Sequence, residues 1–320
     1  MLAPVDEGAV NPVARFEGGR VHADYTARMS SASSPRRTRG SLSRASAGPV
    51  LLIGGAEDKL KARRILSRFV RLAGGSDARL VVVSTASELG DRTTDVYGSI
   101  FRDLGAGDVV GMNPQERHEA EDPGVAAALA RSTGVFLTGG NQLRLTSVVA
   151  GTRLDSGLHL ARDRGAVIAG TSAGASALAA YMLAFGESGA TPRHGIVQLA
   201  AGLGLVPQTV VDQHFEQRTR LGRLLAAIAQ SPSLIGLGLD EDTAAVVHAD
   251  RTMEVFGRGA VTVVDGSRMQ TDAYRLRKRR PMMVSGAVLH SIPGGYWFDL
   301  RSRTLLDAEG GAGAEREASE

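Results

Sequence analysis

Short apolar runs alternate with longer segments of helical spacing through the first half of the chain. Five short runs, each followed by a segment that can form a helix, recur before residue 170: Pro49–Ile53, Leu80–Val83, Asp108–Val110, Val135–Leu137 and Val167–Ala169. Such alternation is typical of a parallel sheet that is buried on both faces. We therefore predict an α/β fold, a three-layer α/β/α sandwich with a mostly parallel central sheet. Ligands of such sheets bind beyond the carboxyl ends of the strands.

The pattern changes after residue 230. Close-spaced strand candidates, separated by Asp and Gly turns, follow one another there: Leu234–Leu239, Thr243–His248, Thr252–Phe256 and Ala260–Val264. This spacing predicts antiparallel strands appended to the same sheet. We expect a single catalytic domain over residues 48–306.

The two ends of the chain differ from this core in composition. Residues 1–47 are rich in Ser and Arg without a sustained apolar period, which predicts a disordered basic leader. Residues 307–320 are mostly Gly, Ala and Glu, which predicts a flexible acidic tail. No apolar run has the length of a secretory signal or of a membrane span. We expect a non-exported, cytoplasmic protein without a membrane partner.

Composition excludes several kinds of chemistry. The chain has no cysteine, so a disulfide, a thiolate metal site and a cysteine nucleophile are all excluded. Any nucleophile is therefore an oxygen or an amine. The aromatic content of 4% argues against a stacking platform for nucleic acid. The net charge of +3 is mild for this length, so no nucleic-acid partner is expected.

The sharpest local signal is Gly170-Thr171-Ser172-Ala173-Gly174, between an apolar run and an alanine-rich segment. A strand that enters Gly-x-Ser-x-Gly and continues into a helix is the context of a nucleophile elbow. Ser172 is the predicted nucleophile, and the N–H of Ala173 faces a developing oxyanion. The competing interpretation is a glycine-rich turn with an N-cap serine.

A second glycine turn follows the preceding apolar run, at Gly139 and Gly140. Paired glycines allow backbone N–H groups to point at a ligand, so this turn is predicted to complete the oxyanion hole. An ordinary strand-exit turn has the same sequence signature.

A serine nucleophile needs a base, and the base needs an orienting acid. Of the seven histidines, His214 is the best candidate, because it follows the apolar run 209–211 at what should be the carboxyl end of a strand. His194, in a predicted loop, is a second candidate. Only two acids, Glu187 and Asp212, lie between Ser172 and His214. Glu187 gives the order Ser–acid–His and is the predicted acid.

Three arginines, Arg218, Arg220 and Arg223, follow His214 within nine positions. Guanidinium groups bind carboxylates through bidentate forks, so this cluster predicts a site for substrate carboxylates. Asp212 would offer the opposite charge to a cationic part of the same substrate. The competing interpretation is a solvated helix start.

Five separated blocks together resemble one family, the cyanophycinases: Gly54-Gly55-Ala56-Glu57-Asp58-Lys59, Thr138-Gly139-Gly140-Asn141-Gln142-Leu143, Gly170–Ala175, Asp212-Gln213-His214-Phe215 with the three arginines, and Leu237-Gly238-Leu239-Asp240-Glu241. Cyanophycinases are serine-type exopeptidases related to aspartyl dipeptidase (peptidase E), with a fold like that of class I glutamine amidotransferases.

The resemblance implies a substrate, a site and an assembly. The substrate is cyanophycin, a poly-aspartate with an arginine on each β-carboxyl, and the product is the β-Asp-Arg dipeptide. Ser172 is the nucleophile and His214 the general base. The implied substrate pocket consists of Gln142, Asp212, Gln213, Arg218, Arg220 and Arg223. A homodimer is expected, and no metal or organic cofactor.

Two other functions remain open from sequence. One is an aspartyl dipeptidase that acts on short Asp-X peptides, and the other is a non-catalytic binding scaffold of the same fold. The charged group Glu57, Asp58 and Lys59 is interpreted as a packed ion pair near the first strand rather than as catalytic support.

Overall fold

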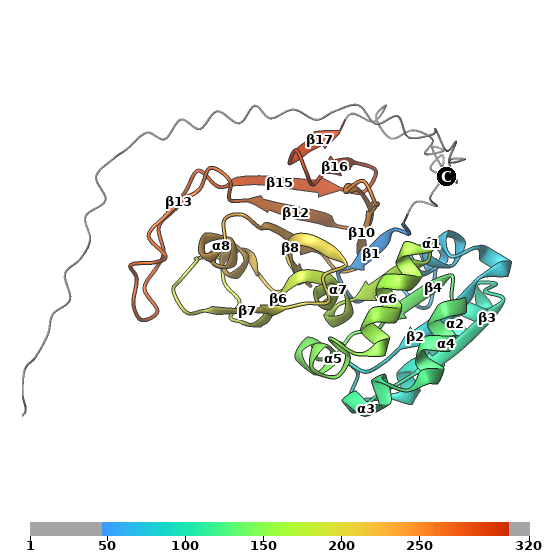
Figure 1. Ribbon diagram of the computed structural model, residues 1–320. Coiled ribbons are helices and arrows are strands. Elements are labelled where there is room, and N and C mark those ends of the chain that lie inside the picture. The colour runs from blue at the N-terminus through green and yellow to red at the C-terminus, as the bar shows by residue number, and fades with distance from the viewer. Residues whose placement is uncertain (1–46, 307–320) are drawn as a thin grey trace, which may run out of the picture. The chain divides into compact units, whose positions relative to one another are not determined.

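The computed structural model describes residues 47–306, and its larger sheet has nine strands in the order β17-β16-β11-β10-β1-β5-β4-β2-β3 (Figure 1). Five strands run parallel: β1 (Val50–Ile53), β5 (Val167–Thr171), β4 (Gly134–Leu137), β2 (Arg79–Val83) and β3 (Asp108–Met112). Four antiparallel strands extend the sheet beyond β1: β10 (Thr243–Val247), β11 (Thr252–Gly257), β16 (Trp297–Asp299) and β17 (Thr304–Leu306). The predicted α/β class, with a largely parallel sheet and antiparallel C-terminal strands, is confirmed.

The parallel strands read as continuous apolar runs because helices cover both faces of this sheet. Successive strand residues point to opposite faces, so Leu51 and Ile53 enter one core while Val50 and Leu52 enter another. The first core packs against α1 (Arg64–Leu72) and α2 (Asp91–Asp103). The second packs against α4 (Pro123–Arg131), α5 (Gln142–Val149), α6 (Arg153–Asp163) and α7 (Ala173–Leu178). A short 3-10 helix, η1 (Gly75–Asp77), and a short α-helix, α3 (Arg117–Ala120), complete this part.

A second sheet of six strands has the order β15-β12-β9-β8-β6-β7 (Figure 1). Its strands are β6 (Ala179–Gly186), β7 (Val197–Ala201), β8 (Val206–Gln213), β9 (Ile235–Leu239), β12 (Ala260–Asp265) and β15 (Val288–Pro293). Helix α8 (Leu221–Gln230) packs apolar side chains on one face of it. The short strands β13 (Gln270–Thr271) and β14 (Val284–Ser285) pair only with each other.

The second sheet corrects one sequence prediction. The strand candidates at 243–248 and 252–256 do extend the first sheet, as β10 and β11. The candidates at 234–239 and 260–264 do not, because β9 pairs in parallel with β8 and β12 pairs with β9. An apolar run records that a strand is buried and does not record its partner, so the two sheets have the same signature in sequence.

The two sheets meet where β1, β5, β8 and β9 end. The N–H of Ser172, just after β5, donates to the carbonyl of Ile53 at 2.9 Å. The N–H of His214, just after β8, donates to Gly54, which follows β1, also at 2.9 Å. The residues that follow these four strands therefore lie close together.

No helix within residues 47–306 is long and apolar enough to cross a membrane. The predicted leader, apart from its last residue, and the predicted tail lie outside the described residues.

Candidate active site

Ser172 occupies a strained turn between β5 and α7. Its φ is 51° and its ψ is −112°, a region that L-residues rarely adopt. The flanking glycines make the turn sterically feasible: a Cβ on Gly170 would lie 2.5 Å from the carbonyl carbon of Gly174, and a Cβ on Gly174 would collide with the carbonyl oxygen of Leu137. The strand–turn–helix geometry predicted from the sequence is present, and it exposes a serine hydroxyl at the end of a parallel strand.

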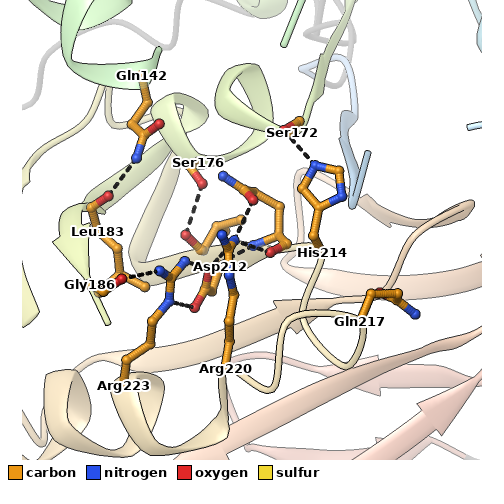
Figure 2. Close-up of polar contacts among 12 residues, drawn as sticks. Gln142, Ser172, Ser176, Leu183, Gly186, Asp212, His214, Gln217, Arg220 and Arg223 are labelled. Carbon is orange, nitrogen blue, oxygen red and sulfur yellow. Dashed lines mark hydrogen bonds and ion pairs between the residues drawn. The ribbon is translucent and has the colours of Figure 1, made fainter. Parts of the chain in front are cut away.

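A hydrogen-bonded series runs from Ser172 through His214 to Glu241. The Oγ of Ser172 lies 2.9 Å from the Nε2 of His214 (Figure 2). The Nδ1 of the same ring lies 2.6 Å from Oε1 of Glu241. Gln217 holds the acid's own backbone, because its Oε1 accepts the N–H of Glu241 at 3.0 Å. A hydroxyl, an imidazole and a carboxylate in this order have the geometry of nucleophile, general base and orienting acid.

The predicted acid, Glu187, lies elsewhere. Its Oε1 is 2.5 Å from Nη2 of Arg279, in a partly exposed ion pair, while the carboxylate on His214 belongs to Glu241. The sequence argument considered only the acids between Ser172 and His214. The signal that points to Glu241 is its place two residues after β9, the strand beside the one that ends before His214.

The environment of His214 favours its neutral form. Burial lowers its pKa below the usual histidine value, the hydrogen bond to Glu241 opposes this, and the positive charge of Arg218 lowers the pKa further. A neutral ring that donates from Nδ1 to Glu241 leaves Nε2 free to accept the proton of Ser172. Gly55 makes room for the ring, since a Cβ there would lie 2.5 Å from Cε1 of His214.

Backbone donors surround the serine. A Cβ on Gly139 would lie 3.3 Å from the Cβ of Ser172, so this backbone passes directly beside the nucleophile candidate. Within the described residues, neither Gly139 nor Gly140 donates its N–H to a backbone carbonyl. Ala173 is the first residue of α7, where an N–H has no partner within the helix. The residues predicted for an oxyanion hole thus have N–H groups available for a ligand.

Asp212 is not an open anionic site. It is 1% exposed, and its carboxylate is held by two arginines (Figure 2). Arg223 donates from Nε to Oδ2 at 2.6 Å and from Nη2 to Oδ1, and Arg220 Nη1 lies 3.2 Å from Oδ1. Arg223 also donates to the carbonyl of Gly186 at 2.8 Å. The sequence predicts that Asp212 meets a cationic part of the substrate, but both of its carboxylate oxygens are already bonded to arginines. In the structure, Asp212 fixes the positions of these two guanidinium groups.

The other predicted pocket residues lie around this cluster. Gln213 accepts a hydrogen bond from Arg220 Nη1 at 2.6 Å, and Gln142 donates to the carbonyl of Leu183 at 2.7 Å. Burial lowers the pKa of Arg220 to about 10 despite the charge of Asp212, and the guanidinium remains protonated at neutral pH. Arg218 is exposed and has no acidic partner among residues 47–306. The cluster is cationic overall, with one arginine open to solvent beside His214.

A serine after a strand of one sheet, hydrogen-bonded to a histidine and a glutamate that follow strands of the other, defines a serine hydrolase type of site. Comparison with known proteins gives the family. Residues 50–255 match peptidase family S51. The chain is 42% identical over 262 residues to the cyanophycinase of Trichormus variabilis, which covers 81% of this chain and 88% of the relative. It is 41% identical over 260 residues to the cyanophycinase of Synechococcus elongatus, or 81% of each chain.

The chain therefore belongs to peptidase family S51 and is a serine peptidase. The resemblance to cyanophycinases that the five sequence blocks predict is confirmed. A solved peptidase from an acI-B1 actinobacterium shares the fold, with a TM-score of 0.55 and 20% identity over 78% of this chain and 98% of that one.

Proposed function

We propose that this chain is a cyanophycinase, which hydrolyses cyanophycin (multi-L-arginyl-poly-L-aspartate) to β-Asp-Arg dipeptides. The observation that carries the proposal is the hydrogen-bonded series Ser172–His214–Glu241 beside a cationic cluster. The cyanophycinases of Trichormus variabilis and Synechococcus elongatus are more than 40% identical to the chain over most of its length.

The reaction begins at Ser172. Nε2 of His214 takes the hydroxyl proton while Oγ attacks the backbone carbonyl of an aspartyl residue. Glu241, rather than Glu187, stabilises the imidazolium that forms, because its carboxylate is the one bonded to Nδ1. His214 then gives the proton to the leaving amine, and water hydrolyses the acyl-enzyme in the reverse sequence of proton transfers.

The oxyanion is bound by the backbone N–H groups of Ala173 and of the Gly139-Gly140 turn. Ala173 and Gly139 lie next to Ser172, and the glycines carry no side chain that could cover the donors. One such donor contributes about 3 kcal/mol to lowering the barrier.

The substrate's carboxylates are bound by the arginines. Each cyanophycin repeat carries a free carboxylate and a guanidinium, and Arg218 is the exposed cation beside the base. Arg220 and Arg223 stand behind it, held by Asp212. Asp212 and Gln213 thus act on the substrate through the arginines, and Gln142 lines the pocket.

The sequence predictions of exopeptidase action, of a homodimer, of a cytoplasmic location and of the class I glutamine amidotransferase-like three-layer arrangement belong to the same proposal. The helices on both faces of the larger sheet support the last of these.

Mass spectrometry of cyanophycin digests tests the proposal, with wild type and Ser172→Ala side by side. We expect β-Asp-Arg from wild type and no product from the variant. Hydrolysis of Asp-X dipeptides without release of β-Asp-Arg would indicate an aspartyl dipeptidase. No turnover together with no labelling by a serine-directed phosphonofluoridate would indicate a binding scaffold.

A further inference from the structure

One short segment, Gly54–Lys59 between β1 and α1, contacts one member of the site directly and the chain neighbours of the other two. Gly55 lies against the ring of His214, because a Cβ on this residue would collide with the ring. The carbonyl of Gly55 accepts the N–H of Asp242, the residue after Glu241, at 2.9 Å. The side chain of Asp242 accepts the N–H of Asp58 at 3.0 Å. The remaining member, Ser172, is reached through Glu57.

Glu57 is a buried carboxylate directly behind the nucleophile. It is 3% exposed, and its Oε2 accepts a hydrogen bond from the hydroxyl of Thr171 at 2.6 Å. Its Oε1 accepts the hydroxyl of Tyr97 and lies 3.0 Å from Nζ of Lys59. Burial and the charge of Glu57 raise the pKa of Tyr97, so the phenol stays protonated and donates. Thr171 is the last residue of β5 and is covalently joined to Ser172.

The sequence interpretation of a packed ion pair accounts for Lys59 but not for the two hydroxyl donors. A buried ion pair rarely stabilises a fold more than apolar side chains of the same size would. The ammonium of Lys59 is also at the edge, since that side chain is 33% exposed. The ion pair does not explain why one oxygen of Glu57 is bonded to Thr171, the residue before the nucleophile. A second role of Glu57 is therefore expected at this contact.

The strain at Ser172 supplies that role. A positive φ at a non-glycine residue persists only where the surroundings hold it. The backbone of Ser172 is held by its N–H bond to Ile53, and the side chain of the preceding residue is held by Glu57. The backbone of Thr171 still pairs with Ile53 when that second contact is lost, but its side chain no longer has a fixed partner. We expect the turn to shift slightly as a result, and Oγ of Ser172 to move relative to His214.

We propose that Glu57 is a positioning residue for the nucleophile, which acts through Thr171 to keep Ser172 Oγ at hydrogen-bonding distance from His214. The proposal rests on Ser172 being the nucleophile, as in the proposed function. It does not depend on cyanophycin being the substrate.

The test compares Glu57→Gln, Thr171→Val and Thr171→Ser. We expect kcat to fall by roughly 10- to 100-fold in the first two, with KM within about twofold, because a small displacement of a reacting atom reduces the rate more than it weakens binding. Thr171→Ser keeps the hydroxyl and should keep most of the activity. The double variant Glu57→Gln/Thr171→Val should be no slower than Thr171→Val alone, since both changes break one interaction.

A second readout is the rate at which a phosphonofluoridate labels Ser172, which requires no peptide substrate. It should fall in parallel with kcat. The acid limb of the pH profile should stay where it is, because Glu57 does not touch the ring of His214. A displaced acid limb in Glu57→Gln would mean that Glu57 acts on the titration of His214 and not on the position of Ser172, and would overturn the proposal.

Glu254 offers a matched control. It is 8% exposed, pairs with Arg68 at 2.6 Å and lies on β11 of the same sheet. Glu254→Gln should lower Tm and leave kcat and the labelling rate unchanged. If Glu57→Gln and Thr171→Val behave in the same way as Glu254→Gln, Glu57 is only structural and the proposal fails. If wild type labels but leaves cyanophycin intact, the proposed substrate fails, and the labelling rates still decide the role of Glu57.

Discussion

At the scale of single residues, the site depends on which carboxylate meets His214. Glu241 lies 2.6 Å from the ring, and Glu187 is paired with an arginine instead. Ser172 and His214 have local signals in the sequence, a glycine-flanked turn after one strand and the end of another. Glu241 also follows a strand candidate, but the sequence does not show that this strand, β9, pairs with β8 and so brings the acid to His214. Local chemistry is thus visible in the chain, whereas a partner brought in by strand pairing is not.

The two glutamates should separate cleanly by mutation. Glu241→Gln removes the charge that stabilises the imidazolium, and kcat should fall roughly a thousandfold to ten-thousandfold. Glu187→Gln removes a partly exposed ion pair, which contributes about 0–1 kcal/mol to stability, and should leave kcat near wild type. Steady-state kinetics on cyanophycin measure both. A large loss in Glu187→Gln with an active Glu241→Gln would restore the sequence assignment.

The low pKa of His214 sets the acid limb of activity. The base must be neutral to accept the proton of Ser172, so activity falls as pH drops through this pKa. A pKa below the usual histidine value therefore keeps the enzyme active to lower pH. Arg218→Gln removes one of the charges that lower it, so the pKa should rise and the acid limb of kcat/KM should move to higher pH. Because Arg218 is exposed, added salt should reduce the difference between the acid limbs of wild type and Arg218→Gln. An acid limb that does not move in Arg218→Gln would contradict this explanation.

At the scale of elements, glycine decides how closely backbone and side chains approach. Gly55 has a φ of 97° and lies under the His214 ring. Gly105, after α2, has a φ of 87° and nothing near its missing Cβ. A side chain at Gly55 is therefore disfavoured by the backbone conformation and by the lack of space, whereas at Gly105 only the backbone conformation disfavours it.

These two glycines form a matched pair for mutation. Both Gly→Ala changes should cost stability, on the order of 1 kcal/mol, because Ala disfavours a positive φ. Gly55→Ala should in addition displace the ring and reduce kcat by roughly 100-fold or more. Thermal unfolding and kinetics separate the two effects. Equal activity of the two variants would show that the ring tolerates the added methyl group.

At the scale of the whole molecule, the second sheet is the part that sequence patterns leave undetermined. The apolar runs at β9 and β12 show buried strands, and the division into two sheets follows from pairings over long distances in the chain. The same sheet carries the buried group of Asp212, Arg220 and Arg223, which joins β8 to α8. The sequence shows the arginines as a cluster, but it does not show that Arg220 and Arg223 share Asp212 as their partner.

Breaking this group should destabilise the fold. Asp212→Asn leaves two guanidinium groups, each 7% exposed, without their counterion. Removing one partner of a buried ionic group typically costs about 3–5 kcal/mol, so urea unfolding should show a large loss. Asp265→Asn is the control, since its partner Arg303 has a side chain 21% exposed and stays hydrated. Similar losses in both variants would contradict the buried-charge explanation.

Because the site forms where four strands end, it can assemble only when the chain has folded around it. Gly54, Ser172, His214 and Glu241 are far apart along the chain, and the contacts between them require both sheets to be paired in register. Contacts at such separation form late and slowly compared with local ones. We therefore expect a partly refolded chain to carry a serine with ordinary alcohol reactivity, and to gain peptidase activity only after both sheets have paired. Phosphonofluoridate labelling during refolding should lag behind the recovery of secondary structure.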